Sequence, residues 1–444
     1  MGSGVGVWLV GARGGVATVV VYGASALRRG LSDATGLVTA RGGCAALDLA
    51  SPGDFVFGGH EVRRGSIAEG GQALARERVI PAEVEEACRE DASRWEANVR
   101  PGFLDVPEPA LGRLDPGVGA LSRLPGAEVV ERLRADLREF RERAGVERLV
   151  VVHLASTEGL RGDREAWDTR RGLERALRSR QFRHRPPASV LYAAAAIEER
   201  CAFVNFTPSP GAAVGALLER AQALGVPHCG NDGKTGETLV KTALAPMFLA
   251  RNLRVLSWEG YNLLGNRDGA VLSRPDRLAA KARSKDESVR RILDDPSVHT
   301  RVSIDFVPSL ADWKTAWDFV HFRGFLGVPM TLQFVWQGCD KALAAPLVID
   351  LVRLADLALR RGERGALAHT ACFFKSPIGA EEHDLHRQVE RLEAYARAAA
   401  RRRSGSGPGP ARAGARRRAG ARRPRSGAGR PRGPRRRGSR RRRG

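Results

Sequence analysis

The feature that most restricts the fold of this chain is a short apolar run that leads directly into a glycine-rich turn. Residues 5–10 read VGVWLV, the turn GARGG follows, and residues 19–30 can continue as a helix. A strand, a tight turn and a helix in this order bring backbone N–H groups and the positive end of a helix to one place. The segment therefore predicts a parallel-sheet domain that can bind the pyrophosphate of a dinucleotide.

The glycine spacing of this turn departs from the dinucleotide fingerprint G-x-G-x-x-G. Counting from Gly11, Arg13 and Val16 stand where the second and third glycines are expected, so a plain tight turn remains an alternative. An acidic residue that holds the adenosine ribose should follow the second strand, and Glu61 is the candidate. Its spacing from Gly11 exceeds the usual ~20 residues, and a loop inserted around residues 41–51 accounts for the excess.

Apolar runs and helical stretches alternate over the first half of the chain. The apolar runs lie at residues 54–57, 149–155 and 202–206, and helical stretches at 131–143 and 190–200 separate the later ones. Strands that alternate with helices indicate a parallel sheet covered on both faces. We therefore predict an α/β fold.

The pattern changes between residues 253 and 338. The segments RVLSWEGYNLL, TRVSIDFVP and MTLQFVWQG show some alternation of apolar and polar side chains, which predicts an open sheet in a second domain. Residues 344–361 then form an amphipathic helix, with Pro346 in its first turn and Gly362 at its end. We expect this helix to pack back on the first domain.

The net charge of +23 is concentrated in a tail. Residues 401–444 contain 19 Arg and no acidic residue, which leaves +4 on the 400 residues before them. The tail has no large apolar side chain, so we expect it to be disordered from about residue 401. We expect it to bind nucleic acid only non-specifically and in a salt-dependent way.

The sequence also argues against membrane, disulfide and metal-site classes. No apolar stretch approaches the ~20 residues that span a bilayer, so we expect no membrane partner and a cytoplasmic location. The six cysteines are far apart without a C-x-x-C pair, and the nine histidines form no H-E-x-x-H motif. We therefore predict reduced core cysteines and no metal site.

A second glycine-rich loop, GNDGKTGET, lies at residues 230–238. It superficially resembles a P-loop, but His228 stands where that motif needs a glycine, which excludes this class of site. The loop precedes a helix expected at residues 239–244, before Pro246. Its backbone N–H groups can still bind a phosphate, with Lys234 as the neutralising charge.

Lysine is rare in this arginine-rich chain, and three lysines have distinctive neighbours. Lys285 lies in RSKD, Lys314 lies between two tryptophans in DWKTAW, and Lys375 follows two phenylalanines in FFKSP. Lysine, unlike arginine, can be tuned by burial or by nearby cations to act as an acid or a base. Most lysines serve surface solubility, but aromatic neighbours indicate partial burial and favour a functional role.

Taken in order, these motifs resemble those of the inositol-phosphate synthase family, the myo-inositol-1-phosphate (inositol-3-phosphate) synthases. The resemblance runs from residue 5 to about residue 379. It depends on the series VGARGGVAT, VFGGHE, ASTE, VNFTPS, NDGKTGET, YNLLGNRDG, SKDES, DWKTAWD, CDKALAAPLVIDL and FFKSP. Each motif is weak alone, whereas the whole series in the family's order is specific.

The resemblance implies a Rossmann-like NAD-binding domain with an inserted α+β domain on an open sheet, used for catalysis and tetramer assembly. We expect the first domain at residues 1–235, completed by 340–380, the second at 236–339, and a C-terminal extension at 381–444. The family uses NAD to cyclise D-glucose 6-phosphate to 1D-myo-inositol 3-phosphate, an isomerase reaction of inositol and phospholipid biosynthesis.

The resemblance also assigns site residues. The positions that match cofactor contacts are Gly11, Gly14, Gly15, Glu61, Ser156, Thr157, Asn205 and Asp232. The positions that match the phosphate cradle are Thr235, Gly236, Glu237, Leu264 and Asn266. The positions that match catalytic residues are Lys285, Lys314, Lys375, Asp268 and Asp340.

The implied reaction oxidises carbon 5, enolises the ketone, closes the ring by an intramolecular aldol step and reduces the ketone again. Each stage places negative charge on an oxygen, which ammonium groups can stabilise while they also move protons. We assign Lys285 and Lys375 to the oxidation and oxyanion end, and Lys314 to the carbonyl of the cyclisation.

Two positions depart from the family pattern. Val289 stands where a second lysine is usual, and Lys281 or Arg290 could take its place. Glu237 stands where an amide is common, and its carboxylate would repel a phosphate unless Lys234 pairs with it. Two alternatives therefore stay open: an NAD-dependent enzyme for another sugar phosphate, and an inactive homologue that binds polyanions through its tail.

Overall fold

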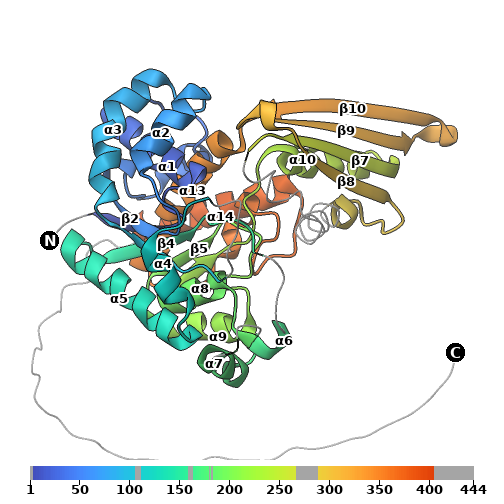
Figure 1. Cartoon of the computed structure of the whole chain (residues 1–444). Coiled ribbons are helices and arrows are strands. Elements are labelled where there is room, and N and C mark those ends of the chain that lie inside the picture. Colours follow the sequence, from blue (N-terminus) through green and yellow to red (C-terminus); the bar gives the residue numbers. More distant parts are fainter. Residues whose placement is uncertain are drawn as a thin grey trace, which may run out of the picture. The chain divides into compact units, whose positions relative to one another are not determined.

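The computed structural model describes residues 4–105, 112–158, 164–179, 181, 184–266 and 289–404. Met1–Arg401 form one compact unit, which contains two separate sheets (Figure 1). Asp268, Lys281, Lys285 and the arginine-rich tail from residue 405 onward lie outside the described residues, and so do the predictions made for them.

The first sheet has seven parallel strands in the order β11-β6-β5-β4-β1-β2-β3. They are β1 (Val5–Val10), β2 (Phe55–Glu61), β3 (Val99–Pro101), β4 (Arg148–His153), β5 (Ala202–Asn205), β6 (Pro227–Cys229) and β11 (Gly365–Ala366). The strand order reverses between β1 and β4, which is where open α/β sheets bind ligands beyond the carboxyl ends of their strands. The longer strands were predicted, whereas β3, β6 and β11 were not.

Helices cover both faces of this sheet, as predicted (Figure 1). One face carries α1 (Gly15–Arg29), α2 (Ile67–Arg76), α3 (Ala82–Glu96) and α13 (Asp340–Arg360). The other carries α4 (Pro116–Ser122), α5 (Gly126–Ala144), α7 (Arg170–Arg178), α8 (Ala188–Glu198) and α9 (Gly215–Leu224), with the short α6 (Arg164–Trp167) next to α7. Strand β1 shows why two layers are needed: Val7 and Leu9 enter one core, and Trp8 and Val10 enter the other.

Two helix boundaries differ from the prediction at prolines. The helix expected to end before Pro246 is α10 (Gly236–Ala250), which continues through it, and α13 begins four residues earlier than predicted, so Pro346 lies in its second turn. Buried residues on both sides of Pro246, such as Ala245 and Phe248, stabilise α10 beyond the backbone hydrogen bond that proline removes. Gly362, with a φ of +65°, follows the end of α13 as predicted.

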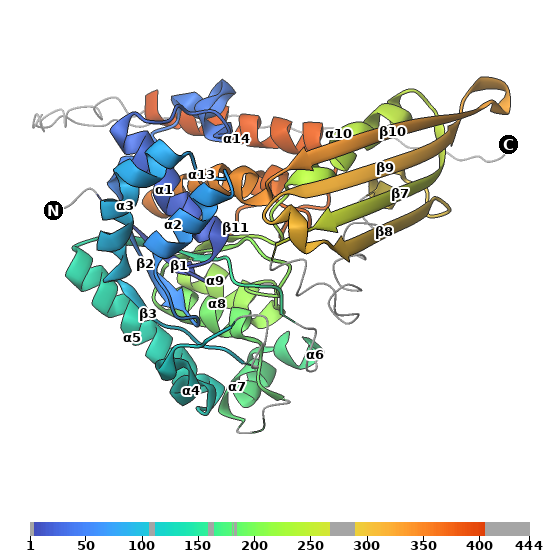
Figure 2. The same ribbon diagram turned by 45° about the horizontal axis from the view of Figure 1, so that its top comes forward.

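The second sheet is open and has the order β10-β9-β7-β8, with its four strands side by side in Figure 2. The strands are β7 (Arg254–Leu264), β8 (His299–Phe306), β9 (Lys314–Arg323) and β10 (Pro329–Gly338). Strand β7 pairs with β8 in parallel, and β9 is antiparallel to β7 and β10. The predicted open sheet is confirmed, and β9 is a strand that the sequence analysis missed.

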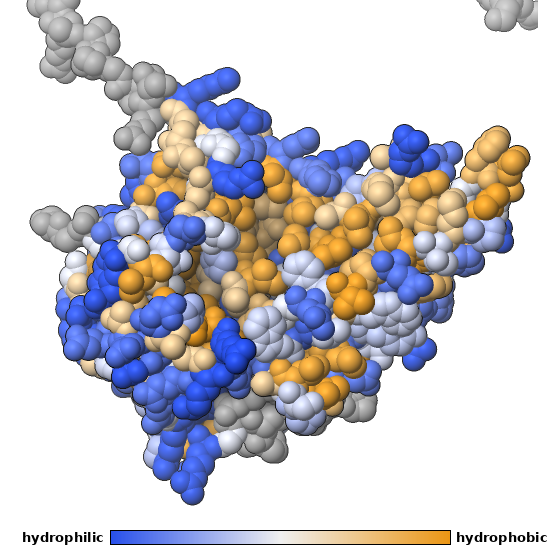
Figure 3. All heavy atoms as spheres, turned by 90° about the horizontal axis from the view of Figure 1, so that it is seen from above, coloured by the Kyte–Doolittle hydropathy of each residue, from blue (hydrophilic) through white to orange (hydrophobic). Residues whose placement is uncertain are grey.

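The two faces of the second sheet differ. Helix α10 covers one face, where Phe248 and Trp258 are buried. The opposite face leaves Trp317 and Val335 39% and 63% exposed, and Phe325 in the loop between β9 and β10 is 88% exposed. Figure 3 shows orange side chains gathered along this sheet as far as that loop. Such a continuous apolar surface is typical of a protein interface.

The last described helix, α14 (Leu385–Ser404), belongs to the compact unit through residue 401. Its Glu393 carboxylate accepts a hydrogen bond from the backbone N of Gly43 (2.7 Å), and the Tyr395 hydroxyl donates to the Glu363 carboxylate (2.9 Å). The folded unit therefore continues past residue 379, where the motif resemblance ends.

All six cysteines are unpaired and buried, which confirms their predicted place in the core. In the part of the chain that the structure describes, none of the helices has the length and apolar character needed to cross a bilayer.

Candidate active site

The glycine turn after β1 forms a cradle at the start of α1. Gly11 has a φ of +89°, and its carbonyl accepts a hydrogen bond from the backbone N of Gly14 (2.8 Å). Gly14 is the N-cap of α1, without a side-chain cap, and no acidic residue follows in the first turn. Because a Cβ on Gly14 would lie 2.9 Å from the Gly11 carbonyl oxygen, glycine keeps this turn tight. Uncapped N–H groups at a helix start fit a pyrophosphate.

Replacing Gly14 with alanine is expected to weaken NAD binding at least about tenfold, because the added Cβ meets a backbone atom that cannot move without opening the turn. Isothermal titration calorimetry measures the effect. Gly119→Ala is the matched control, since nothing lies within 4 Å of a Cβ at this position in α4. Equal NAD affinity in both variants would show that the cofactor does not depend on the turn.

Glu61, the predicted ribose ligand, ends β2 beside this turn. Its carboxylate accepts hydrogen bonds from the backbone N atoms of Arg13 (2.8 Å) and Val62 (2.9 Å) and from the Arg63 guanidinium (3.1 Å). Burial alone would raise the pKa of Glu61, but the hydrogen bonds and charge of Arg63 outweigh it and lower the pKa. The predicted inserted loop is present as three short 3-10 helices between α1 and β2.

The other predicted cofactor residues also follow strands of the first sheet. Ser156 and Thr157 come after β4. Asn205 ends β5 and donates hydrogen bonds to the Ser209 carbonyl (2.6 Å) and the Asn231 side chain (2.9 Å). They lie at the carboxyl edge on the β4 side of the point where the strand order reverses, and the glycine turn and Glu61 lie on the β1 side. The sheet therefore brings together residues that are far apart in the sequence.

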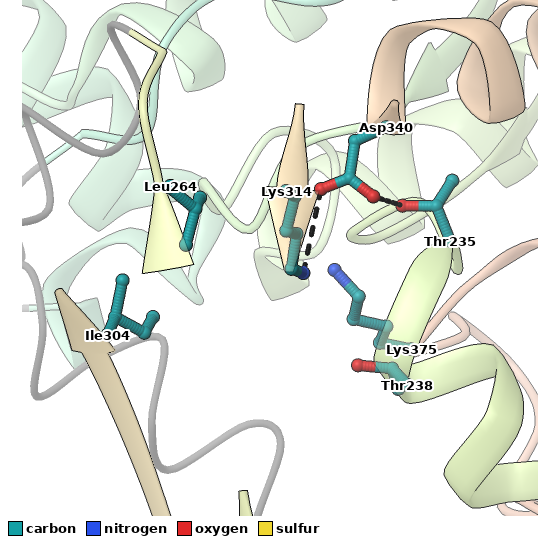
Figure 4. A pocket seen from close by; sticks show the side chains of 7 residues that line it. All are labelled: Thr235, Thr238, Leu264, Ile304, Lys314, Asp340 and Lys375. Carbon is teal, nitrogen blue, oxygen red and sulfur yellow. Dashed lines mark hydrogen bonds and ion pairs between the residues drawn. The ribbon is translucent and has the colours of Figure 1, made fainter. Parts of the chain in front are cut away.

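A small pocket lies between the two sheets. It is lined by Thr235, Thr238, Leu264, Ile304, Lys314, Asp340 and Lys375. Figure 4 shows the amino groups of Lys314 and Lys375 pointing toward one another from different elements. Each lysine is only 7% exposed. The structure thus places two of the three predicted catalytic lysines in one pocket.

Lys375 is aligned by a short backbone ladder between two distant segments. Its backbone N donates to the Asp232 carbonyl (2.7 Å), and the backbone N of Asn231 donates to the Ser376 carbonyl (2.8 Å). The Lys375 ammonium then lies 2.9 Å from the Asp232 carboxylate. This pair joins a predicted catalytic residue to a predicted cofactor residue.

Lys314 begins β9, and its ammonium lies 3.6 Å from the carboxylate of Asp340, the first residue of α13. Asp340 also accepts a hydrogen bond from the Thr235 hydroxyl (3.3 Å), as Figure 4 shows. Thr235 is the N-cap of α10, without a side-chain cap. Gly236, with a φ of +55°, keeps the start of α10 open toward this pair. A helix start beside an ammonium group suits a phosphate.

Comparison with known proteins agrees with this geometry. A family model described as myo-inositol-1-phosphate synthase, an NAD-binding family, matches residues 5–397. The chain belongs to the myo-inositol-1-phosphate synthase family. NAD is therefore its cofactor, and the uncapped turn at α1 fits the cofactor's pyrophosphate.

Relatives in this family share about a third of the sequence. Inositol-3-phosphate synthase 1 of Bacteroides thetaiotaomicron is 33% identical over 412 residues, covering 87% of this chain and 91% of the relative. The Trypanosoma brucei inositol-3-phosphate synthase is 31% identical over 71% of this chain. The chain spans only 60% of that protein and 56% of the 32% identical human enzyme.

Solved structures show the same fold. The inositol-3-phosphate synthase of Caenorhabditis elegans superimposes with a TM-score of 0.76 at 24% identity, covering 89% of this chain and 86% of that one. A synthase-related protein from Thermotoga maritima gives a TM-score of 0.71 at 24% identity, with 88% and 98% coverage. The Rossmann-like domain with an inserted second sheet is thus confirmed.

Thr235 and Leu264 of the predicted phosphate cradle line the pocket, whereas Glu237 and Asn266 lie outside its lining. Glu237 is fully buried and does not line the pocket, because its carboxylate pairs with Lys241 (2.6 Å) one helical turn along α10. Lys234 does not pair with Glu237; its ammonium donates to the Gln388 side chain of α14. Burial lowers the pKa of Lys234 to about 8. Asn266 is described but lies outside the pocket lining.

Arg290 does not take the place of the second lysine that the family resemblance implies at position 289. Val289 is 1% exposed and packs with Ala245 and Phe248 in the core of the second sheet. The Arg290 guanidinium donates to the Val298 carbonyl (3.1 Å). This position therefore supports the core of the second sheet rather than the pocket.

Sequence reasoning missed several residues at or near the pocket. Thr238 and Ile304 line it but carry no signal beyond their place in the glycine loop and in an alternating strand. Asp312 and Lys341 form an ion pair between the segment before β9 and the start of α13. A contact between residues so far apart in sequence has no local pattern that could reveal it.

Proposed function

We propose that this chain converts D-glucose 6-phosphate to 1D-myo-inositol 3-phosphate. The observation that carries the proposal is the pocket itself, where Lys314 from the second sheet and Lys375 beside the first sheet face each other. Family membership supplies the reaction class. The pocket supplies what that class needs, since two ammonium groups can stabilise oxygen anions and move protons.

The start of α10 would hold the substrate's phosphate. Thr235 and Gly236 place uncapped backbone N–H groups there, and Lys314 adds a positive charge at the same end of the pocket. Leu264 and Ile304 supply an apolar wall. In this orientation the part of the sugar that is farther from the phosphate points toward Lys375 and Asp232.

The lysines would act on the oxygens of the sugar. When bound, NAD would supply the hydride acceptor for the oxidation at carbon 5 and the hydride donor for the reduction after ring closure. Lys375 passes the proton of the carbon 5 hydroxyl on to the Asp232 carboxylate and stays an ammonium. It then stabilises the enolate oxygen that forms when the Asp340 carboxylate takes the carbon 6 proton. Lys314 donates to the carbon 1 carbonyl oxygen while carbon 6 attacks carbon 1. Asp340 orients Lys314 by its ion pair.

Product analysis tests the proposal. The purified chain is incubated with NAD and D-glucose 6-phosphate, and the products are identified by phosphorus and carbon NMR. Inositol phosphate supports the proposal. Unchanged glucose 6-phosphate from folded, NAD-binding protein contradicts it, and turnover of a different sugar phosphate would support the related alternative that Val289 and Glu237 leave open.

We also propose that residues 236–339 form the catalytic and assembly domain of a homotetramer. The open face of the second sheet supports this, because Trp317 and Val335 remain exposed in a single chain. Strand β10 is also an edge strand of the described sheet, with unpaired backbone groups.

Replacing Val335 with aspartate is expected to convert the tetramer to smaller species, because a charge would enter the buried interface without a partner. Size-exclusion chromatography with light scattering measures the mass. Val389→Asp, on the exposed side of α14, is the matched control and should leave the mass unchanged. A tetramer that persists in the Val335 variant would place the interface elsewhere.

The cysteines support a cytoplasmic location. All six are unpaired thiols, as in proteins of a reducing compartment.

A further inference from the structure

Lys341, the second residue of α13, lies across the start of α1. A Cβ on Gly15, the first residue of α1, would lie 2.6 Å from Lys341 Cδ and 3.1 Å from Lys341 Nζ. The lysine therefore fills the space that any side chain at this position of α1 would occupy. Its ammonium group lies at the positive end of the helix, where like charge is unfavourable unless an anion is present.

In the described structure that anion is the Asp312 carboxylate, which forms an ion pair with Lys341. Asp312 precedes β9 and also contacts Glu77 at the end of α2: burial, together with the Asp312 carboxyl group, raises the pKa of Glu77. Trp313 adds a hydrogen bond from its indole N to the Glu77 carbonyl (3.1 Å). The segment before Lys314 is thus fastened to the first domain beside the glycine turn.

Arg13, the other positively charged residue near the glycine turn, already has hydrogen-bond partners. The Arg13 guanidinium donates to the Glu96 carboxylate and to the Arg63 carbonyl (2.7 Å). A pyrophosphate at the start of α1 brings two negative charges to a place that offers backbone N–H groups and where Arg13, within the described part of the chain, is already paired. Lys341 is a described ammonium group next to that place.

We propose that Lys341 is a ligand of the cofactor's pyrophosphate and exchanges Asp312 for it when the cofactor binds. The proposal rests on NAD binding by the proposed function and adds a residue that family resemblance did not assign. Gly15 and Lys341 act together, since the absent side chain of one makes room for the ammonium group of the other. A purely structural alternative is that Lys341 only fastens the segment before β9.

The test measures binding of ADP-ribose, which contains the pyrophosphate but no nicotinamide, by calorimetry on nucleotide-free protein. Lys341→Met is expected to weaken ADP-ribose binding about 10- to 100-fold, the range of a lost charge-assisted hydrogen bond. Adenosine, which has no phosphate, should bind wild type and variant within about twofold of each other. Arg251→Met, at the exposed end of α10, is the matched cation control and should leave ADP-ribose affinity unchanged.

Asp312→Asn separates the two roles of the ion pair. If Lys341 binds the pyrophosphate, removal of the competing carboxylate leaves ADP-ribose affinity equal or higher. If Lys341 only fastens the segment, Lys341→Met and Asp312→Asn should weaken binding alike. That second pattern, or unchanged ADP-ribose affinity in Lys341→Met, overturns the inference while the proposed function stands. Wild-type protein that binds neither NAD nor ADP-ribose would overturn both.

Discussion

Replacing Lys314 with methionine should lower turnover at least about 1000-fold, because the pocket loses a group that both stabilises an oxygen anion and supplies a proton. The fold and the NAD affinity should remain, since Lys314 contacts Asp340 beside the start of α10 and not the glycine turn. Inositol phosphate formation measured by NMR, together with NAD titration of the same sample, checks both parts.

Lys314→Arg distinguishes charge from proton transfer. Arginine keeps the positive charge but does not release its proton at useful pH. The arginine variant should therefore bind glucose 6-phosphate better than the methionine variant while it remains severely impaired in turnover. A rate close to wild type in the methionine variant would remove Lys314 from the mechanism.

Replacing Lys241 with methionine should destabilise the folded chain by about 3–5 kcal/mol, the usual cost of leaving buried charges without their partner. Lys241 lies 2.6 Å from the Glu237 carboxylate and 3.2 Å from the Asp318 carboxylate, and all three side chains are buried. Urea unfolding measures the loss. Arg251→Met at the exposed end of α10 is the control and should stay within about 0.5 kcal/mol of wild type.

The pH dependence gives this prediction a second readout. Burial raises the pKa of Asp318, and the Glu237 carboxylate adds to the effect while Lys241 opposes it. Without Lys241 the folded state binds a proton at Asp318 more readily than the unfolded state does, so stability rises as the pH falls. The deficit of the Lys241 variant should therefore be smaller at pH 5 than at pH 8. An equal deficit at both values would contradict the charge explanation.

The sequence predicts well the elements that are determined by residues adjacent in the chain. The glycine turn and β1 follow from adjacent residues, and the six-residue apolar run matches the observed strand. The position of Glu61 beside the turn also follows, because parallel strands bring their carboxyl ends to one edge.

Strand β9 shows why other elements are missed. Lys314 and Asp318 occupy inward positions where an alternating strand normally places apolar side chains. These two residues are polar because Lys314 faces the pocket and Asp318 pairs with Lys241. A strand that carries site and buried charged groups on its inner face therefore loses the pattern by which strands are recognised.

Glu237 illustrates a different limit. Sequence alone suggested Lys234 as its partner, three residues away, but the helix begins between them at Gly236. Within α10, residues four apart share a face, so Lys241 takes that role. Where a helix begins decides which charges meet, and that boundary depends on tertiary contacts that no short motif reveals.

The contact between Gln388 and Lys234 determines where the arginine-rich end can be removed without harm. Shortening the protein at residue 380, where its motifs end, would take away the hydrogen-bond acceptor of a buried lysine two residues from Asp232. Cutting after Ser404 keeps that acceptor in place. Removal of the arginine-rich end can thus leave the folded protein intact or damage it, depending on whether residues 381–404 are kept.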